Sequence, residues 1–427
     1  CLAMGYPDWA ALMSDLDNHR DAISSQFDQV ALRESAGDAP LEQRFATAWE
    51  SGEDEEHWSA LLHEAGERNV SGVARRLVEF SNSPATQQID AVATARLKRF
   101  IPQLLVEIMR APRPEIAIAR TLLVIERILR RSAYISLLNE NRSALTRLVD
   151  LCARSQYIAD QIARFPVLLD ELLDPRIFSG MVTKQELVSE LSQRLAVDGA
   201  ADSETTIQVI SQFQRATMFR IAVADFNGSL PIMKVSDGLT WLAETVLDEA
   251  LRVAWQDLAS RHGNPCYVVD GVRHEAGFGI IGYGKLGGLE LSYGSDLDIV
   301  FLHDSRGSAQ VTNGERPLDN SMFYGRLVRR LVHFLTTQTG SGALYDVDTR
   351  LRPDGHKGLL VSSTEAFERY QEDNAWTWEH QALLRARPVA GSPSIAAEFE
   401  RIRRDTLVNR AKRDVLRDDV VSMRRRM

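Results

Sequence analysis

The sequence is poor in cysteine and has no long apolar run. Among its 427 residues the cysteines are Cys1, Cys152 and Cys266, and none forms a pair at the spacing of metal ligands. We therefore expect reduced, structural thiols in a cytoplasmic protein. No apolar run reaches the roughly 20 residues that span a bilayer, and no signal peptide is recognisable, so we expect no membrane contact.

An excess of positive charge is also absent. The 50 Lys and Arg residues against 59 Asp and Glu residues give a net charge of −9, which argues against a general nucleic-acid partner. The length allows about two to four domains. Because the chain starts at Cys1 and stops at Met427 inside a helix-like pattern, we interpret it as a fragment of a longer polypeptide.

The spacing of apolar residues divides the sequence into four segments. We predict a helical segment with a linker over residues 1–85, and helix after helix over residues 86–262. Short strands and helices alternate over residues 263–391, and residues 392–427 start a further helical domain. The predicted fold class is α+β and predominantly α-helical, with a small mixed sheet flanked by helical bundle regions.

Within residues 263–391 the pattern predicts several strands and one long helix. We expect strands at Phe278–Tyr283 and Asp296–His303, and further strands at 344–351 and 358–362. No crossover helix fits between the first two strands, so we expect them to be direct neighbours without βαβ geometry.

The segment from Gly282 to Asp304 carries the chemistry. Asp296 and Asp298 lie two apart at the start of an apolar strand, so both carboxylates point one way and the apolar residues point the other. Mg²⁺ prefers such oxygen ligands and commonly shares them with substrate phosphates. Gly284, in the preceding turn, lets the backbone approach a phosphate. The pattern favours a metal-dependent nucleotidyl-transfer site.

The strand predicted at 344–351 supplies a third carboxylate. Asp346, Asp348, Arg350 and Arg352 alternate along it and would share one face. Alone, such a face could simply be solvated; beside the Asp pair we favour the catalytic interpretation. Asp348 would complete the metal site and is also a candidate proton acceptor, and the guanidinium groups can clamp phosphates.

Other catalytic patterns fit poorly. Gly282 to Gly287 matches G-x-G-x-x-G, but only eight residues separate Gly287 from Asp296, which leaves no room for the helix of a dinucleotide-binding unit. The histidines are scattered and no G-x-S-x-G elbow exists. Trp376 and Trp378 could stack a base, but we favour the packing of two helical aromatics.

These motifs resemble a known family. A glycine-containing turn, about ten residues and then Ser-Asp-x-Asp is the pattern of the DNA polymerase β-like nucleotidyltransferase superfamily. Most members have Gly-Ser where this chain has Gly284-Lys285, and that departure is typical of bifunctional glutamine synthetase adenylyltransferase/adenylyl-removing enzymes. The runs 290–298 and 347–353 are similar to that group, and the chain looks like its C-terminal, adenylylating half.

The resemblance implies a polymerase β-like nucleotidyltransferase core over residues 263–391. It also implies transfer of AMP from ATP to a tyrosine hydroxyl of glutamine synthetase, with Mg²⁺ or Mn²⁺, under control of glutamine and the PII signalling protein. Asp296, Asp298 and Asp348 carry over as the metal-binding catalytic residues. The nucleotide contacts carry over as Gly284, Lys285, Gly287, Ser295, Arg350 and Arg352.

Three alternatives stay open at this point. The same metal site could serve phosphorolytic removal of AMP from glutamine synthetase, because the two reactions differ only in the phosphorus-bearing partner. The chain could be a regulatory binding module with a silent site. The superfamily motif alone would also allow a small-molecule nucleotidyltransferase, although the large helical region before the site favours a protein substrate.

Overall fold

The computed structural model divides the chain into two compact units, Cys1–Ile177 and Phe178–Met427. This division falls inside residues 86–262, which we predicted to be one helical region, and the four predicted segment boundaries stay a prediction. Residues 1–38 of the predicted N-terminal segment lie outside the described part of the chain. The structure describes residues 39–66, 70–174, 183–198, 203–340, 342–410, 417, 419, 421 and 422.

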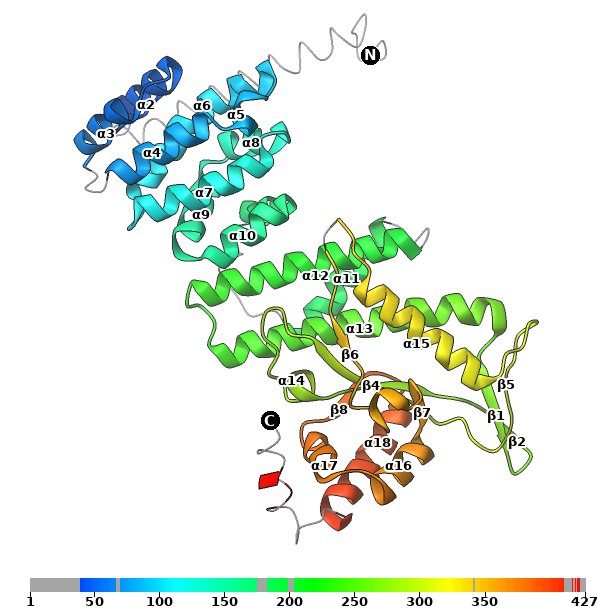
Figure 1. The fold of residues 1–427 in the computed structure, drawn as a ribbon. Coiled ribbons are helices and arrows are strands. Elements are labelled where there is room, and N and C mark those ends of the chain that lie inside the picture. Colours follow the sequence, from blue (N-terminus) through cyan, green and yellow to red (C-terminus); the bar gives the residue numbers. More distant parts are fainter. Residues whose placement is uncertain are drawn as a thin grey trace, which may run out of the picture. The chain divides into compact units, whose positions relative to one another are not determined.

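The described part of the first unit consists of helices (Figure 1). Apolar residues at helical spacing give each helix one buried face, and the side chains of Leu104, Ile125 and Leu148 have no exposed surface. Burying a side chain of this size contributes about 1.5–3 kcal/mol. The elements are α2 (Ala39–Ser51), α3 (Glu55–Glu64), α4 (Val70–Ser81), α5 (Pro84–Gln87), α6 (Ala91–Arg110), α7 (Pro114–Ile128), α8 (Ser132–Glu140), α9 (Arg142–Arg154), α10 (Gln156–Arg164) and the 3₁₀ helix η2 (Pro166–Leu173).

The second unit holds every strand that the structure describes. Its helices are α11 (Lys184–Asp198), α12 (Ser203–Phe226), α13 (Ile232–His262), α14 (Gly284–Gly287), α15 (Asn320–Thr336), η4 (Gly355–Lys357), α16 (Thr364–Asp373), α17 (Thr377–Leu383), α18 (Pro393–Asp405) and η5 (Thr406–Arg410). Its strands are β1 (Pro265–Val269), β2 (Val272–Glu275), β3 (Phe278–Gly282), β4 (Leu297–His303), β5 (Ser308–Thr312), β6 (Val347–Asp348), β7 (Val361–Ser363) and β8 (Arg387–Gly391).

The larger sheet is mixed and runs in the order β6–β4–β3–β8, with β7 also paired to β4. Strands β3 and β4 are antiparallel neighbours, as the absence of a crossover helix predicted, and β8 is antiparallel to β3. Strands β6 and β7 are parallel to β4. A second sheet, β2–β1–β5, was not predicted. The architecture confirms the α+β, predominantly helical fold class and is compatible with a polymerase β-like core.

Both faces of the larger sheet are covered, so its central strand has a core on each side. Leu297, Ile299 and Phe301 of β4 pack in a core that includes residues of α12, α13 and α15. The alternate residues Val300 and Leu302 pack in a core that includes residues of α16, α17 and α18. Figure 1 shows these two groups of helices on opposite sides of the strands. The period of two along the strand therefore directs Asp298 away from the α13 side.

The strand predicted at 344–351 is mostly not a strand. Only Val347–Asp348 pairs with β4, and the chain turns directly afterwards, where Arg352 N donates to Thr349 O at 3.3 Å. The alternating pattern predicted a longer strand because it does not register this turn. Arg350 and Arg352 consequently lie in a turn and not on a common strand face. Of the strand predicted at 358–362 only the last two residues are in a strand, β7, which ends at Ser363.

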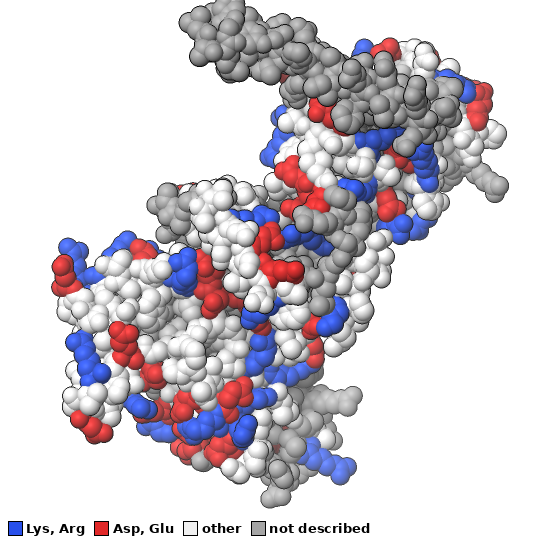
Figure 2. All heavy atoms as spheres, turned by 180° about the vertical axis from the view of Figure 1, so that it is seen from behind, with Lys and Arg blue, Asp and Glu red and all other residues white. Residues whose placement is uncertain are grey.

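Two further observations concern the charge of the surface and the apolar character of the helices. Figure 2 shows Lys and Arg interspersed with Asp and Glu over the described atoms of the face in view, without a broad field of one sign. Among the described residues, no helix combines the length and the apolar character needed to cross a membrane.

His303, at the end of β4, predicts acid sensitivity of the second unit. Its ring stacks on Tyr324 with centroids 4.5 Å apart, and Nδ1 accepts from Ser305 N at 3.2 Å. Burial lowers the pKa of His303 from 6.5 to about 4. As the pH falls, the His303 ring therefore takes up a proton in the unfolded chain before it does so in the folded one. The free energy of unfolding decreases between about pH 6.5 and pH 4, by up to about 3 kcal/mol.

We expect His303→Phe, which keeps the stacked ring but cannot titrate, to reduce this loss. Chemical denaturation at pH 7 and pH 5 would measure it. Equal losses in the variant and the unmodified chain would contradict the prediction.

Candidate functional site

A tight turn with a buried backbone separates β3 from the carboxylates. The four-residue helix α14 starts at Gly284, whose φ of +52° is a conformation that favours glycine. A Cβ on Gly284 would lie 2.2 Å from Asp298 Oδ2. Glycine was predicted here so that the backbone could approach a phosphate; the structure shows that it also makes room for the Asp298 carboxylate.

The three predicted carboxylates share one electrostatic environment. Asp298 and Asp348 are register partners in the parallel pair β4–β6, and Asp296 lies exposed just before β4. Burial raises the pKa of Asp298, and the negative charges of Asp296 and Asp348 raise it further. Arg350 and Lys285 oppose this rise. The structure thus brings together residues that are about 50 positions apart in the chain.

Asp348 is held by Arg350. The Arg350 backbone N–H donates to Asp348 Oδ1 at 2.8 Å, and its Nε donates to Oδ2 at 2.6 Å. The hydrogen bonds from Arg350 lower the pKa of Asp348. Among the described residues, no three His, Cys, Asp or Glu side chains are gathered as a ready metal site. The engagement of Asp348 by Arg350 is a physical reason for this.

The donor set nevertheless fits a hard divalent cation. Asp296, Asp298 and Asp348 offer only carboxylate oxygens, the ligands that Mg²⁺ and Mn²⁺ accept together with phosphate oxygens. Besides burial, which is the largest cause of the raised pKa of Asp298, the negative charges of Asp296 and Asp348 disfavour its ionised form. A bound cation would relieve this repulsion, provided that Asp348 turns away from Arg350.

The remaining predicted residues of the turn differ in what surrounds them. Lys285 is exposed on α14 and close enough to Asp298 to lower its pKa. Gly287 has no space for a side chain, because a Cβ would lie 2.0 Å from Arg385 O. Ser295 Oγ accepts from Ser292 N at 3.2 Å and contacts the Ser292 hydroxyl at 2.9 Å, so it closes a local turn.

Arg352 is directed into its own loop. Its Nη1 donates to the Thr349 carbonyl and hydroxyl, both at 2.9 Å, and Nε and Nη2 donate to Gly358 O and His356 O at 3.4 Å. This buried guanidinium ties residues 349–358 together. The arrangement favours a role in loop structure over the predicted phosphate clamp, which Arg350, exposed beside Asp348, fits better.

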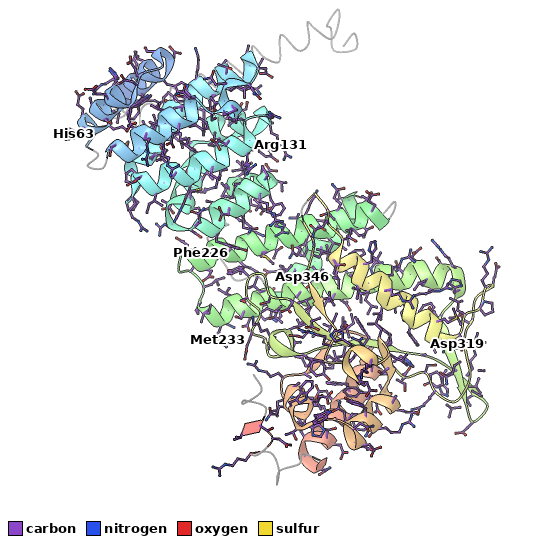
Figure 3. The ribbon with its side chains drawn as sticks, in the orientation of Figure 1. His63, Arg131, Phe226, Met233, Asp319 and Asp346 are labelled. Carbon is purple, nitrogen blue, oxygen red and sulfur yellow. The ribbon has the colours of Figure 1, made fainter. Side chains whose placement is uncertain are left out.

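The environment of Asp346 differs from that of Asp348. Asp346, labelled in Figure 3, is exposed just before β6, and its backbone oxygen accepts from Leu297 N at 2.9 Å. It therefore extends the β4–β6 pairing by one hydrogen bond. The packing predicted for Trp376 and Trp378 is wrong, because their exposed fractions are 66% and 41%.

Sequence reasoning did not assign a role to a buried ion-pair cluster behind the turn. Glu244 of α13 pairs with Arg387 of β8 and with Lys184 of α11, and Arg387 also donates to carbonyls of α14. A glutamate within the apolar stripe of α13 was the available signal, because an unpaired charge is rarely buried.

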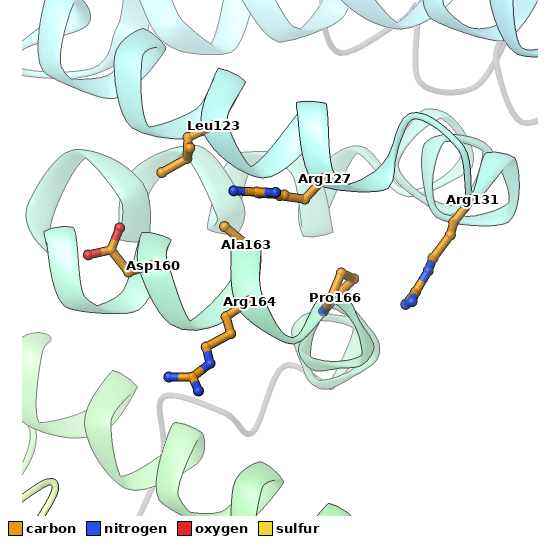
Figure 4. A pocket seen from close by; sticks show the side chains of 7 residues that line it. All are labelled: Leu123, Arg127, Arg131, Asp160, Ala163, Arg164 and Pro166. Carbon is orange, nitrogen blue, oxygen red and sulfur yellow. The ribbon is translucent and has the colours of Figure 1, made fainter. Parts of the chain in front are cut away.

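A cavity in the first unit has mainly arginines as its charged lining residues, unlike the carboxylate site of the second unit. It has a volume of about 570 Å³ and lies against α7, α10 and η2, and Figure 4 shows the arginines and the one carboxylate on its walls. A single carboxylate does not provide the ligand set of a two-carboxylate metal site. Its lining residues are Leu123, Arg127, Arg131, Asp160, Ala163, Arg164 and Pro166.

The second unit therefore has the order of turn, strands and carboxylates that the sequence predicted for a nucleotidyltransferase. A glycine turn follows one strand, a pair of carboxylates opens the antiparallel neighbour, and a third carboxylate lies on a parallel strand beside it. The sequence profile of the family described as glutamate-ammonia ligase adenylyltransferase matches residues 145–402, which is more than half of the chain. The chain belongs to this family.

Individual relatives agree with the family assignment. A bifunctional glutamine synthetase adenylyltransferase/adenylyl-removing enzyme of Thioalkalivibrio sulfidiphilus is 45% identical over 100% of this chain and 44% of its own length. Proteins of the same name from Pseudomonas putida and Nitrosococcus oceani are 44% and 42% identical, over 99% and 100% of this chain. The chain spans less than half the length of these curated relatives.

The substitution Gly284→Ala tests whether the turn tolerates a side chain at this position. We expect a loss of about 2–4 kcal/mol in stability, since the variant combines an unfavourable φ with displacement of the Asp298 carboxylate. Gly294→Ala is the matched control: φ is +71° there, but nothing lies within 4 Å of the added Cβ, so a loss of only about 1 kcal/mol is expected. Denaturant unfolding of both variants gives the comparison, and equal losses would argue against the steric constraint.

We expect substitutions of Arg350 and Arg352 to differ in their effect on stability. Arg352→Lys removes the planar fork from several loop acceptors, and we expect a loss of about 1–3 kcal/mol. Arg350→Lys changes an exposed pair and should leave the melting temperature nearly unchanged. Thermal unfolding of both variants would show this order, and a larger loss for Arg350→Lys would contradict it.

Proposed function

We propose that this chain is an adenylyltransferase that moves AMP from ATP to a tyrosine hydroxyl of glutamine synthetase and releases pyrophosphate. The observation that carries the proposal is the pairing of Asp298 with Asp348 across β4 and β6 beside the Gly284 turn, with Asp296 close enough to raise the pKa of Asp298. Family membership supports it, because the relatives carry adenylyltransferase in their names. The identity of the substrate comes from those names and is part of the proposal.

The carboxylates would hold one or two divalent cations together with the triphosphate. Mg²⁺ or Mn²⁺ bound there would supply the positive charge that stabilises the attacking and leaving oxygens of an in-line displacement. Lys285, exposed beside Asp298, and the N–H groups of α14 are placed to contact phosphate oxygens. Arg350 would transfer its guanidinium from Asp348 to the triphosphate once Asp348 becomes a ligand.

In the transfer step the tyrosine oxygen forms a bond to the α-phosphorus, and the bond to the bridging oxygen of pyrophosphate breaks. The tyrosine proton leaves to solvent water in this step, so that the products are the tyrosyl-AMP ester, pyrophosphate and a proton. Arg350 lowers the pKa of Asp348, so in this arrangement Asp348 is a weaker proton acceptor than an ordinary carboxylate. Asp348 therefore suits the role of ligand better than that of general base.

Control by glutamine and the PII protein is the regulatory part of the proposal. It follows from the family resemblance and would operate in the cytoplasm, where ATP and glutamine synthetase are available. Removal of AMP by phosphorolysis is the main alternative, since the relatives are named for both reactions.

Label transfer from α-labelled ATP to unmodified glutamine synthetase in the presence of Mg²⁺ would test the proposal. We expect Asp296→Asn/Asp298→Asn to reduce transfer by at least about 100-fold, because several kcal/mol of charge stabilisation is lost. Asp270→Asn is the matched control: this exposed carboxylate lies in the β1–β2 turn at φ 50°, which asparagine tolerates.

The opposite assay separates the alternatives. The chain would be mixed with adenylylated glutamine synthetase and phosphate, and ADP release would be followed. ADP release without label transfer would assign the removing reaction to this chain and overturn the proposal. Neither reaction, with intact binding of glutamine synthetase, would make the chain a regulatory module.

A further inference from the structure

A buried carboxylate joins three elements of the second unit. Glu244 lies on α13 with an exposed fraction of 3%, and its two oxygens pair with Arg387 of β8 and Lys184 of α11. A carboxylate taken out of water is costly unless cations and hydrogen bonds compensate it. Since Arg387 and Lys184 together carry one positive charge more than Glu244 compensates, the Arg387 guanidinium can also donate to neutral carbonyl groups.

Arg387 uses this charge on the backbone of α14. Its Nε donates to Gly287 O and its Nη2 donates to Leu286 O, each at 3.1 Å. These carbonyls belong to the last two residues of the four-residue helix, and Leu286 O also accepts from the backbone N–H groups of Gly288 and, at 3.5 Å, of Leu289. A planar guanidinium can bridge two neighbouring carbonyls, whereas a lysine ammonium is a single point charge.

The bridged turn is the one that faces the carboxylates. Leu286 and Gly287 directly follow Lys285, the exposed cation beside Asp298. Gly284, at the other end of α14, lies so close to Asp298 that an added Cβ would come within 2.2 Å of its carboxylate oxygen. A shift of the α14 carbonyls would therefore move Lys285 and disturb the contact with Asp298.

From this geometry we propose that Arg387 is a positioning residue for nucleotide binding and that Glu244 holds Arg387 in place. Arg387 acts through α14, so that Lys285 and the N–H groups of the turn meet the triphosphate. The role rests on the proposed nucleotidyl-transfer function and adds two residues that lie behind the turn and touch no substrate.

Equilibrium binding of α,β-methylene-ATP with Mg²⁺ tests this role without requiring turnover. We expect Arg387→Lys to weaken binding at least about tenfold, because one ammonium cannot bridge both carbonyls. In the transfer assay the same variant should raise the KM for ATP and leave the KM for glutamine synthetase unchanged. A merely structural residue would lower the amount of folded protein without this split.

Arg120→Lys is the matched control. Arg120 also donates to two consecutive carbonyls, Cys152 O at 3.0 Å and Ala153 O at 3.3 Å, but it does so in the first compact unit. Both variants remove a guanidinium from two consecutive carbonyls, which Arg120 contacts through Nη1 alone and Arg387 through Nε and Nη2. Only Arg387 contacts α14, so only Arg387→Lys should change nucleotide binding. Equal affinities in these two variants and the unmodified chain would overturn the positioning role.

Glu244→Gln provides an independent second variant. It preserves the shape of the side chain, removes the charge that anchors Arg387, and should weaken nucleotide binding in the same direction. Combined with Arg387→Lys it should add less than its separate effect, because both changes act on one contact. Unchanged nucleotide binding by Glu244→Gln would overturn the proposal that Glu244 anchors Arg387. This test remains valid even if Arg387→Lys does not fold.

The outcomes also separate this inference from the proposed function. No binding of the analogue by the unmodified chain would overturn the nucleotidyl-transfer proposal and the positioning role with it. Binding by the unmodified chain that is unaffected in both variants would overturn the positioning role alone.

Discussion

The site depends on the contact between a glycine of the α14 turn and a carboxylate. Gly284 has a positive φ and lies directly against Asp298, so there is no room for a side chain between the turn and the start of β4. Gly287, at the other end of α14, is equally confined by the backbone of Arg385. The turn thereby keeps its N–H groups and Lys285 beside the carboxylates, as the proposed binding of a triphosphate with its cations requires.

The electrostatics of the site conflict with the stability of the folded chain. Burial is the largest cause of the raised pKa of Asp298, and the negative charges of Asp296 and Asp348 add to it. Arg350 relieves part of the repulsion by holding Asp348. Such uncompensated charge is expected where a cation and a polyanionic substrate complete the structure. The arrangement therefore resembles a site prepared for ligands more than a surface optimised for stability.

The sequence predicted the strands and carboxylates that depend on local pattern, and it failed where the chain turns. The apolar run after Asp296 correctly indicated β4, with its alternate residues buried on two sides. The alternation from 344 to 351 predicted one strand, but the structure has two strand residues and then a turn held by Arg352. Strand β8 and the small β2–β1–β5 sheet were missed, because short strands that pair over long distances carry little local signal.

The sequence by itself determined the class of chemistry, since the Ser-Asp-x-Asp pattern after a glycine turn specifies which side chains are available and which way they alternate. Only the tertiary structure decided which of them lie together. Parallel pairing of β4 with β6 placed Asp348 opposite Asp298, and the turn after β6 separated the roles open to Arg350 and Arg352. The buried partnership of Glu244 with Arg387 also depended on the tertiary fold, because long-range pairing is set by packing and not by spacing along the chain.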